Sequence, residues 1–576
     1  MPAYSPPVDD MHFLLTHVLA VQDLHAELDT DTTQAILDEA AKLAREELAP
    51  LNRTGDQQGC QLDNGEVTTP DGFSQFYAQY CDGGWNGLAF DPEYGGQGLP
   101  WALAFAVQEM WQGANLAFGL CPLLNQGAVE TLQAHGTAEQ KTAYLPNLIH
   151  GNWTGTMNLT EPQAGSDLGK IKAKAWQGDN GTYRLQGNKI YITYGEHDMA
   201  GNIIHLVLAR LPDAPEGVKG VSMFAVPKYL TDDHGNAARR NDVVCTGLED
   251  KLGIHASPTC SIAYGAESEG AVAYLVGEEH QGIKHMFTMM NNARLCVGLQ
   301  GVALAERASQ AAHSYASERI QGKDAATGES DVTIDRHGDV GRMLGTMRAL
   351  TRAGRALCYS AGRSLDDAHA GNEQARARLD LLTPVVKAWC TDIAQDVSDM
   401  TIQVYGGMGF IEETGVAQFY RDARILPIYE GTNGIQAADL VFRKVLRDDG
   451  AALNTFLDEL SRIRERSPDD LTRSLPGLDE WLGEANGLLD RGTGKLFGYS
   501  TSDSVKALEA CSYAYLSLFG TVAGAFILTR NAATALETDM PQEFQAQILS
   551  DLELYCRVIL PRARSLYQMI GTPAIA

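Results

Sequence analysis

Apolar residues recur with helical spacing in the first and last parts of the chain, and with a shorter alternating pattern in the middle. From Asp31 to Leu48 the apolar positions fall on one face of a helix. We predict a helix there, with Asp31 or Thr32 as its N-cap and Pro50 at its end. Further helical runs follow at 101–110 and 126–134, so residues 10 to about 150 are expected to be helical with intervening loops.

Short alternating runs replace the helical pattern from about residue 153. These runs cover 170–176, 183–187, 190–193, 203–209, 222–227 and 260–264. Turn residues separate them, as in Gly178-Asp179-Asn180-Gly181. Regularly spaced short strands with turn signals are typical of a small all-β domain of the sandwich or barrel type.

Helical periodicity returns near Gly282 and continues to about residue 446, and Asp448-Asp449-Gly450 indicates a boundary before another helical region. We therefore predict a multidomain α+β fold. Its parts are an N-terminal extension (1–34), an N-terminal helical domain (35–152), a central β domain (153–278), a helical bundle (279–447) and an additional C-terminal helical domain (448–576).

One apolar segment in the last region is long enough to span a bilayer. Twenty uncharged residues lie between Glu509 and Arg530. The segment also contains serines, glycines and a threonine and lacks a strongly basic flank, so a buried central helix of a bundle is favoured. Peripheral membrane contact is the alternative.

Composition indicates a soluble globular protein, with 44% hydrophobic and 20% charged residues in a chain of 576. The net charge of -28 opposes non-specific nucleic-acid binding. Ten scattered cysteines form no CxxC pair, and the first ten residues lack a secretory signal, which favours reduced thiols and a cytoplasmic location. No metal-site motif and no convincing GxGxxG or P-loop motif is present, so we expect no metal site.

The sequence from Arg421 to Gln436 places a single carboxylate, Glu430, between an apolar run and a flexible Gly431-Thr432. Apolar surroundings disfavour the charged form and should raise the pKa of Glu430 toward that of a useful general base. A helical pattern resumes afterwards, which places the carboxylate at a helix entrance. Taken alone, the alternative is an exposed glutamate in a loop.

Four other segments carry candidate chemistry, although each alone also has an ordinary structural interpretation. They are 157–167 (MNLTEPQAGSD), 191–198 (YITYGEHD), 291–294 (NNAR) leading to 319–323 (RIQGK), and 403–410 (QVYGGMGF). In the second, Tyr191 and Thr193 alternate with Ile192 and are expected on one side of a strand.

The ordered set of these motifs, with KLGIHASPTC at 251–260 and RDARILPIYEGT at 421–432, resembles the acyl-CoA dehydrogenase family. The resemblance covers roughly residues 35 to 445. The Glu196-His197-Asp198-Met199 variant and the extra C-terminal region look more like a larger bacterial subgroup that includes the 3-methylmercaptopropionyl-CoA dehydrogenases. The family fold has a helical domain, a β domain and a helical bundle.

The resemblance implies FAD as the cofactor, bound between the β domain and the bundle. Leu159 and Thr160 would contact the flavin ring, with Tyr191 and Thr193 near its reactive nitrogen and Thr432 as a further contact. Arg319 and Gln321 would reach the pyrophosphate of a neighbouring subunit's FAD. Gln403, Gly406 and Gly407 would surround that neighbour's adenosine. Tyr191 replaces the usual Trp, and the segment from Arg319 is one residue shorter than the common form.

The resemblance also implies that Glu430 removes the α-proton of an acyl thioester while the β-hydrogen passes to the flavin as hydride, giving a trans-2-enoyl-CoA. Some relatives carry the base where this chain has Asn292 and Ala293, neither of which is acidic. The implied substrate-binding residues are Ser166, Asn291, Arg294, Tyr429 and Gly431. The implied partners are acyl-CoA, electron-transfer flavoprotein and a second copy in a homodimer or tetramer.

Three other hypotheses compete with this one. An acyl-CoA oxidase would use oxygen directly. A DNA-associated flavoprotein of the alkylation-response type would want a basic C-terminal region, whereas residues 451–576 carry 11 basic and 16 acidic side chains. A catalytically silent scaffold is disfavoured because the base and flavin motifs occur together.

Overall fold

The computed structural model describes residues 4–25, 27–232, 235–502 and 504–573. The contacts divide the chain into two compact units. We call the first the bundle unit; it comprises Met1–Arg45, Pro100–Gly113 and Arg294–Ala576. The second, here called the β unit, comprises Glu46–Leu99 and Ala114–Ala293. This division differs from the order of domains along the chain, because the segment 100–113 belongs with the bundle helices.

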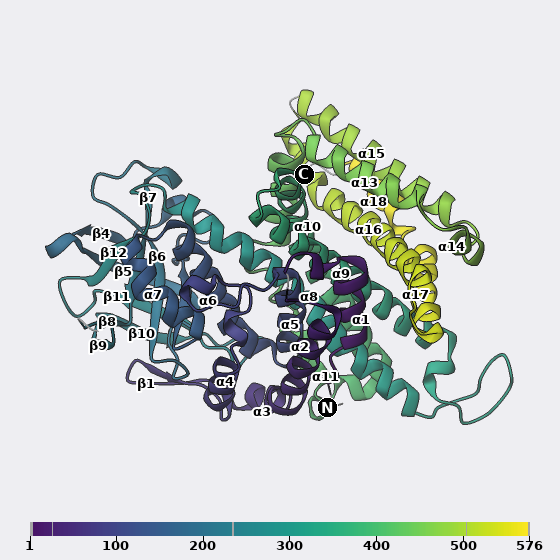
Figure 1. The fold of residues 1–576 in the computed structure, drawn as a ribbon, viewed down its shortest axis with the longest axis horizontal. Coiled ribbons are helices and arrows are strands. Elements are labelled where there is room, and N and C mark those ends of the chain that lie inside the picture. The colour runs from purple at the N-terminus through teal and green to yellow at the C-terminus, as the bar shows by residue number, and fades with distance from the viewer. Residues whose placement is uncertain (1–3, 26, 233–234, 503, 574–576) are drawn as a thin grey trace. The chain divides into compact units, whose positions relative to one another are not determined.

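Long helices form the centre of the bundle unit (Figure 1). They are α5 (Trp101–Ala114), α8 (Gly282–Glu318), α9 (Gly338–His369) and α10 (Glu373–Tyr405), followed by the short α11 (Val416–Ala423) and α12 (Asn433–Ala438). A tight turn joins α9 to α10, and the Asn372 side chain caps α10 by accepting from the backbone N–H groups of Gln374 and Ala375. Asp366 on α9 accepts from the backbone N–H groups of Trp101 and Ala102, which fixes the start of α5.

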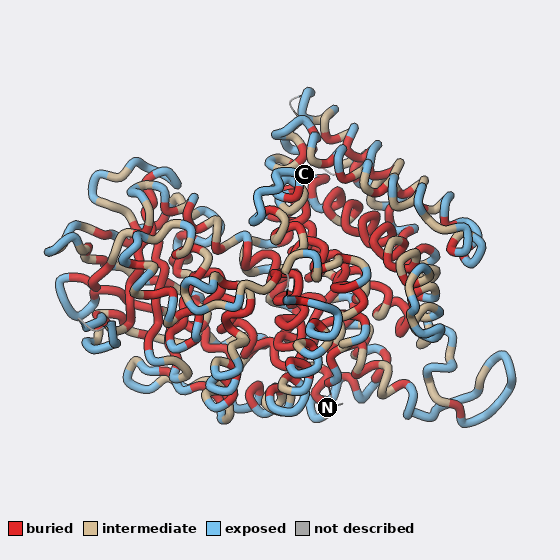
Figure 2. The backbone as a smooth tube through the Cα atoms, viewed as in Figure 1, coloured by how far each residue is buried: buried red, intermediate tan, exposed pale blue. Residues whose placement is uncertain are grey.

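Six helices complete the C-terminal part of this unit. They are α13 (Ala451–Glu465), α14 (Asp469–Ser474), α15 (Leu478–Thr501), α16 (Val505–Glu537), α17 (Gln542–Leu554) and α18 (Arg562–Gly571). Helix α16 lies among the other helices, and most residues of its central part are buried (Figure 2). Among the described residues, α16 alone has the length and composition of a membrane span, and 89% of its most apolar window is buried. The segment expected as a central helix is therefore one.

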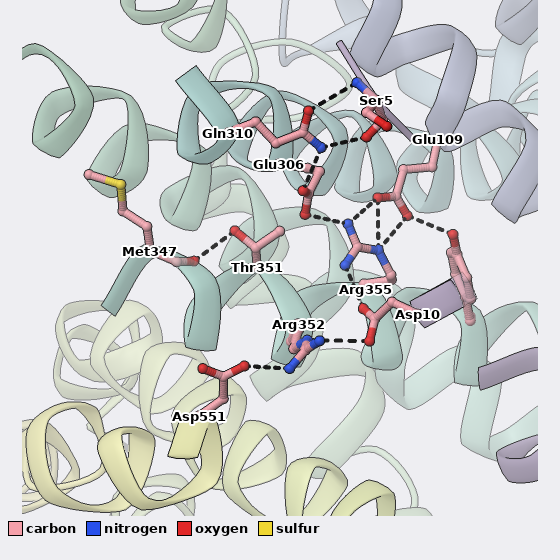
Figure 3. A network of polar contacts seen from close by, with 11 residues as sticks. Ser5, Asp10, Glu109, Glu306, Gln310, Met347, Thr351, Arg352, Arg355 and Asp551 are labelled. Carbon is pink, nitrogen blue, oxygen red and sulfur yellow. Dashed lines mark hydrogen bonds and ion pairs between the residues drawn. The ribbon is translucent and has the colours of Figure 1, made fainter. Parts of the chain in front are cut away.

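The N-terminal residues are joined to this unit by a buried ion cluster (Figure 3). Helices α1 (Val8–Phe13) and α2 (Thr30–Leu43) pack together, and Asp10 of α1 accepts from Nη1 of Arg355 at 2.8 Å. Arg355 also donates to Glu109 at 2.9 Å and 2.7 Å and to Glu306 at 2.7 Å. One guanidinium on α9 thus connects α1, α5 and α8.

The β unit combines four helices with the sheet. Its helices are α3 (Pro50–Gln58), α4 (Phe73–Asp82), α6 (Leu116–His135) and α7 (Ala138–His150). Two short strands, β1 (Gln61–Asp63) and β2 (Glu66–Thr68), form a hairpin between α3 and α4. Helix α6 packs on β3 (Trp153–Asn158), and Asn125 of α6 accepts from the backbone N–H of Gly155 at 3.0 Å.

The main sheet has the order β10-β11-β5-β12-β7-β6-β3, with β4 pairing both β5 and β6. The strands are β4 (Lys174–Gln177), β5 (Tyr183–Thr193), β6 (Asn202–Arg210), β7 (Val221–Pro227), β10 (Val243–Leu248), β11 (Thr259–Tyr264) and β12 (Ala271–Leu275). Strands β5, β12, β7, β6 and β4 close a ring, which makes this part a small barrel. A separate hairpin is formed by β8 (Tyr229–Thr231) and β9 (Ala237–Arg240).

Several local predictions differ from the structure. The first predicted helix begins at Thr30, with Asp29 as the N-cap, because the Asp29 side chain accepts from the backbone N–H of Thr32 at 2.7 Å. The end of this helix agrees with the prediction, because α2 continues as a π-helix over Ala44–Leu48 and stops before Pro50. Pro50 then occupies the first turn of the next helix, α3, where its missing N–H costs no hydrogen bond. The two runs 183–187 and 190–193 are one continuous strand, β5.

Candidate active site

The loop that carries Glu430 is a compact turn between α11 and α12. Backbone hydrogen bonds from Tyr429 to Ile425 (3.1 Å) and from Asn433 to Pro427 (3.0 Å) close it. Glu430 itself has φ of 56°, and Gly431 has φ of 83°. A left-handed conformation is costly for a glutamate, and residues held in this way are concentrated at functional sites.

Residues at the N-terminal end of α12 hold this loop against α10. Thr432 caps α12, with its hydroxyl accepting from the backbone N–H of Ile435 at 3.3 Å. Asn433 donates to the backbone carbonyl of Ala388 at 3.1 Å and to Asp392 at 2.9 Å. Gln436 donates to the backbone carbonyl of Glu430 at 3.2 Å. The conformation of Glu430 is therefore fixed from both sides.

Burial raises the pKa of Glu430 to about 7, although the charges of Arg294 and Lys387 oppose this change. Lys387 on α10 is fully buried and donates from Nζ to the side-chain carbonyl of Asn433 at 2.9 Å. Burial lowers the pKa of Lys387 to about 7, against the opposing charges of Glu430 and Asp392. A carboxyl group with this pKa can accept a proton near neutral pH.

A buried polar chain leads from the neighbouring Tyr429 into the bundle. The Tyr429 hydroxyl donates to the side-chain oxygen of Gln300 on α8. Gln300 in turn donates to Gln112 on α5 at 3.2 Å. These contacts hold the ring of Tyr429 in one orientation beside the base.

Arg294 lies one helical turn beyond Asn291 on α8, but the two differ in exposure. Arg294 is buried, and its guanidinium lies 3.8 Å from Asp439. Asn291 is exposed. Arg294 thus belongs to the surroundings of Glu430, whereas Asn291 is available at the surface of the helix.

In the β unit, the candidate residues after β3 lie beside the end of β5. The backbone N–H of Ile190 donates to the carbonyl of Thr160 at 3.0 Å, which brings Thr160 next to Tyr191. Tyr191 has φ of 61° and a side chain that is 59% exposed, whereas the intervening Ile192 is buried. Tyr191 and Thr193 therefore share one face of the strand, as predicted.

A buried ion pair between Lys189 and Glu161 anchors the turn that follows β3. Nζ of Lys189 donates to the carbonyl of Leu159 at 3.0 Å and to Glu161 at 2.8 Å. Glu161 also accepts from the backbone N–H groups of Lys172 and Ala173. Burial would raise the pKa of Glu161, but Lys189 and these amides outweigh it and lower the pKa. Ser166 lies beyond the turn and is exposed.

The remaining candidates lie at the far end of α8 and α10. Tyr315 and Tyr405 stack there with ring centroids 4.0 Å apart, so the two helices end side by side. The exposed Arg319 and Gln321 follow α8 in a narrow hairpin, closed by the hydrogen bond from Gln321 to Val332 at 2.9 Å. The exposed residues Gln403, Gly406 and Gly407 lie at the end of α10.

The candidates at these helix ends lie too far from Glu430 to reach the base of the same chain. Gly406 follows Lys387 by nineteen residues, which corresponds to about 28 Å of helix. The structure thus brings together Glu430, Gly431, Thr432, Tyr429 and Arg294 as one group, and the residues at the helix ends as another.

Family models match nearly the whole chain. The acyl-CoA dehydrogenase N-terminal, middle and C-terminal domains match residues 30–152, 156–265 and 280–445. The chain belongs to the acyl-CoA dehydrogenase family. A further model, described as acetyl-CoA dehydrogenase C-terminal like, matches residues 454–574 of this acyl-CoA dehydrogenase.

Curated relatives share most of its length. The 3-methylmercaptopropionyl-CoA dehydrogenase of Ruegeria pomeroyi is 45% identical over 95% of this chain and 93% of its own. A broad-specificity linear acyl-CoA dehydrogenase of Mycobacterium tuberculosis is 36% identical over 79% of this chain and 77% of its own. This acyl-CoA dehydrogenase is therefore an oxidoreductase and a flavoprotein, as the motifs predicted.

Two solved structures share the fold across the extra C-terminal domain. The Caenorhabditis elegans protein ACDH-11 in complex with C11-CoA has a TM-score of 0.78 at 21% identity, covering 96% of this chain and 91% of its own. An acyl-CoA dehydrogenase of Bacillus anthracis complexed with FAD has a TM-score of 0.75 at 20% identity, covering 95% and 88%. The predicted fold of helical domain, β domain, bundle and additional helical domain is confirmed.

The cofactor of this acyl-CoA dehydrogenase is FAD, and the residues on the β5 face suit it. Tyr191 offers an exposed aromatic ring, and the hydroxyls of Thr160 and Thr193 have no hydrogen-bond partner among the described residues. Two free hydroxyls beside an aromatic ring are a donor set for a flavin, whose ring is flat and carries polar edges.

Sequence reasoning missed Lys387 and the pair formed by Glu161 and Lys189. Lys387 lies in an apolar helical run, where a lysine is unusual and is a detectable signal. Lys189 lies in a strand pattern and its partner in a turn 28 residues earlier, so no spacing rule connects them.

Proposed function

We propose that this enzyme carries out the FAD-dependent α,β-dehydrogenation of 3-methylthiopropionyl-CoA or a related fatty acyl-CoA to the trans-2-enoyl-CoA. Glu430 carries the proposal, because it is a carboxylate with left-handed φ and a pKa raised by burial to about 7. The 45% identical relative that acts on 3-methylmercaptopropionyl-CoA supports this choice of substrate. Electron-transfer flavoprotein is the proposed electron acceptor.

Glu430 is the proposed base for the α-proton of the thioester. An α-carbon proton is weakly acidic, so charge that develops on the thioester oxygen needs a fixed donor. The backbone N–H of Glu430 makes no hydrogen bond within the described residues, so it is available as this donor. FAD supplies the acceptor for the β-hydride when it is bound.

Lys387 and Arg294 have a positioning role in this proposal. Their charges favour the ionised form of Glu430, which limits the effect of burial on its pKa. The hydrogen bond from Lys387 to Asn433 also fixes the start of α12, directly after the base. Ionisation and orientation of the base therefore depend on the same buried lysine.

Anaerobic flavin bleaching tests the reaction. Purified wild type and Glu430→Gln are mixed with acyl-CoA thioesters of increasing length and with 3-methylthiopropionyl-CoA. Glu413→Gln, an exposed glutamate in the preceding loop, is the matched control. We expect wild type and Glu413→Gln to bleach rapidly and Glu430→Gln to bleach at least about a hundredfold more slowly. Equal bleaching by Glu430→Gln would remove Glu430 from the role of base.

The electron acceptor is tested separately with the reduced wild type. After substrate addition, reoxidation is followed with electron-transfer flavoprotein and, in another sample, with dissolved oxygen. Fast reoxidation by the flavoprotein and slow reoxidation by oxygen are expected. The opposite order would favour the acyl-CoA oxidase reaction.

Assembly is part of the proposal because the residues at the ends of α8 and α10 lie far from the base of their own chain. We propose that Arg319, Gln321, Gln403, Gly406 and Gly407 contact FAD of a neighbouring copy in a homodimer. Light scattering after gel filtration measures the mass, and a monomer that retains FAD would contradict the assignment. Arg319→Ala should lower FAD retention without changing the helical content measured by circular dichroism.

A further inference from the structure

A cavity of about 1040 Å³ lies within the bundle unit, away from the loop that carries Glu430. Five parts of the unit line it: the N-terminal residues 18–23, the end of α9, the start of α10, one face of α13 and one face of α16. Its volume is at the upper end of the range for small-molecule sites. All of these parts belong to the same compact unit.

Arg530 on α16 is one of the residues that line this cavity, and its guanidinium has an unpartnered edge. Its Nε and Nη2 atoms are buried and have no hydrogen-bond partner among the described residues. These two nitrogens form the side-on edge of the guanidinium, from which two N–H bonds point in parallel. That geometry matches the two oxygens of one carboxylate or phosphate group.

The neighbouring carboxylate is already engaged by another arginine. Both oxygens of Glu459 accept from Arg378, at 2.8 Å and 2.9 Å. The guanidinium of Arg378 also lies over the ring of Phe456, 5.9 Å from its centroid. Two arginines therefore share one carboxylate, which leaves an uncompensated positive charge in the cavity wall.

The other carboxylates of the cavity do not compensate Arg530. Asp367 pairs with Arg363 at 3.2 Å, and Asp448 accepts from the backbone N–H groups of Gly450 and Ala452. The remaining three are exposed, namely Asp23, Glu373 and Glu537. An isolated buried cation is costly, so an anionic partner is expected at Arg530.

We propose that this cavity binds a small organic oxyanion, whose carboxylate or phosphate group takes the bidentate edge of Arg530. Polar residues and one aromatic residue line the rest of the cavity, including Ser360, Ser364, Thr455, Thr534 and Phe456. A ligand of mixed polarity with one anionic end fits this lining. Because the cavity joins the N-terminal segment to α13 and α16, occupancy would stabilise the additional domain on the bundle.

Isothermal titration of the FAD-loaded full chain tests the proposal, with inorganic phosphate and succinate as the two probes at constant ionic strength. We expect one-to-one binding of at least one probe with a Kd below about 1 mM, and the preferred probe identifies the anionic group. Arg530→Met and Arg530→Lys should weaken binding at least tenfold, because lysine retains the charge but lacks the bidentate edge. Arg557→Met, which removes an exposed arginine of the same unit, should bind as wild type does.

Two further readouts separate a binding site from a structural cation. Without probe, Arg530→Met should melt at or above the wild-type temperature, since it removes an unpaired buried charge, and its flavin bleaching should be unchanged. Absence of binding to wild type, or equal binding to Arg530→Met, overturns the proposal. A melting temperature of unliganded Arg530→Met several degrees below wild type also overturns it. The bleaching assay fails independently if the proposed dehydrogenation is wrong.

Discussion

The pKa of Glu430 leads to a quantitative pH dependence of the chemical step. With a pKa of about 7, about one Glu430 in eleven is ionised at pH 6 and about ten in eleven at pH 8. The base must be ionised to accept a proton, so the rate falls as the pH decreases through 7. Anaerobic single-turnover bleaching should therefore be about tenfold faster at pH 8 than at pH 6.

Removal of the nearby lysine charge should move this profile. Lys387→Met removes a charge that lowers the pKa of Glu430, so the acidic limb should shift upward by about one pH unit. At pH 7 the change in ionisation alone would lower the bleaching rate about fivefold. At pH 9 this part of the loss disappears, and only the effect of the missing hydrogen bond to Asn433 on the orientation of the base remains. Lys506→Met, at an exposed position of α16, is the control and should leave the profile unchanged.

The refuting result is a bleaching rate that stays constant from pH 5.5 to 8 in wild type. A glutamate with an ordinary pKa is almost fully ionised throughout that range, so a flat profile would show that the loop does not desolvate Glu430. An unchanged profile in Lys387→Met would separately remove the lysine from the electrostatics of the base.

Three further predictions concern stability and the cofactor. Arg355→Met leaves Glu109, Asp10 and Glu306 without their shared cation, so the free energy of unfolding measured by urea denaturation should fall by about 3–5 kcal/mol. The control, Arg342→Met, breaks an exposed ion pair and should change this free energy by less than about 1 kcal/mol. Lys189→Met removes the cation of the buried Glu161 and the anchor of the Leu159 carbonyl, so FAD retention through gel filtration should fall, while the exposed Lys174→Met should retain FAD. Gly431→Ala places a Cβ 2.8 Å from Nε2 of Gln436 at a φ of 83°, which should cost about 1–2 kcal/mol and slow flavin bleaching at pH 8, where ionisation of Glu430 is nearly complete. If Arg355→Met, Lys189→Met or Gly431→Ala behaves as wild type in its assay, the role given to that residue is wrong.

Sequence reasoning was most informative where a pattern had one physical explanation. The uncharged segment 510–529 lies in a buried helix, α16, and the alternation of Tyr191, Ile192 and Thr193 gave the correct faces of β5. The start of strand β3, before Met157, was missed because nearly every residue of Trp153–Asn158 is buried, so no alternation marks it. Closure of the barrel through Lys174 and Arg210 depends on a contact between distant strands that no local pattern contains.

The same distinction applies to the candidate active site. Glu430 was selected as the candidate base from its apolar neighbours and the following glycine, and the predicted rise of its pKa agrees with the effect of burial in the structure. Its left-handed φ and the role of Lys387 could not be predicted, because they arise from the packing of α10 against α12.

The ion cluster at Arg355 also has a consequence for the order of events during synthesis. Arg355 follows its partner Asp10 by 345 residues and Glu109 by 246. At about 5–20 residues per second, Asp10 emerges from the ribosome roughly 20–70 seconds before its arginine. Throughout that interval the N-terminal helices and α5 lack the cation that joins them, and their carboxylates keep these segments hydrated. The bundle unit is thus expected to assemble late, after α9 has been translated, while the β unit is complete in sequence by residue 293 and is free to fold first.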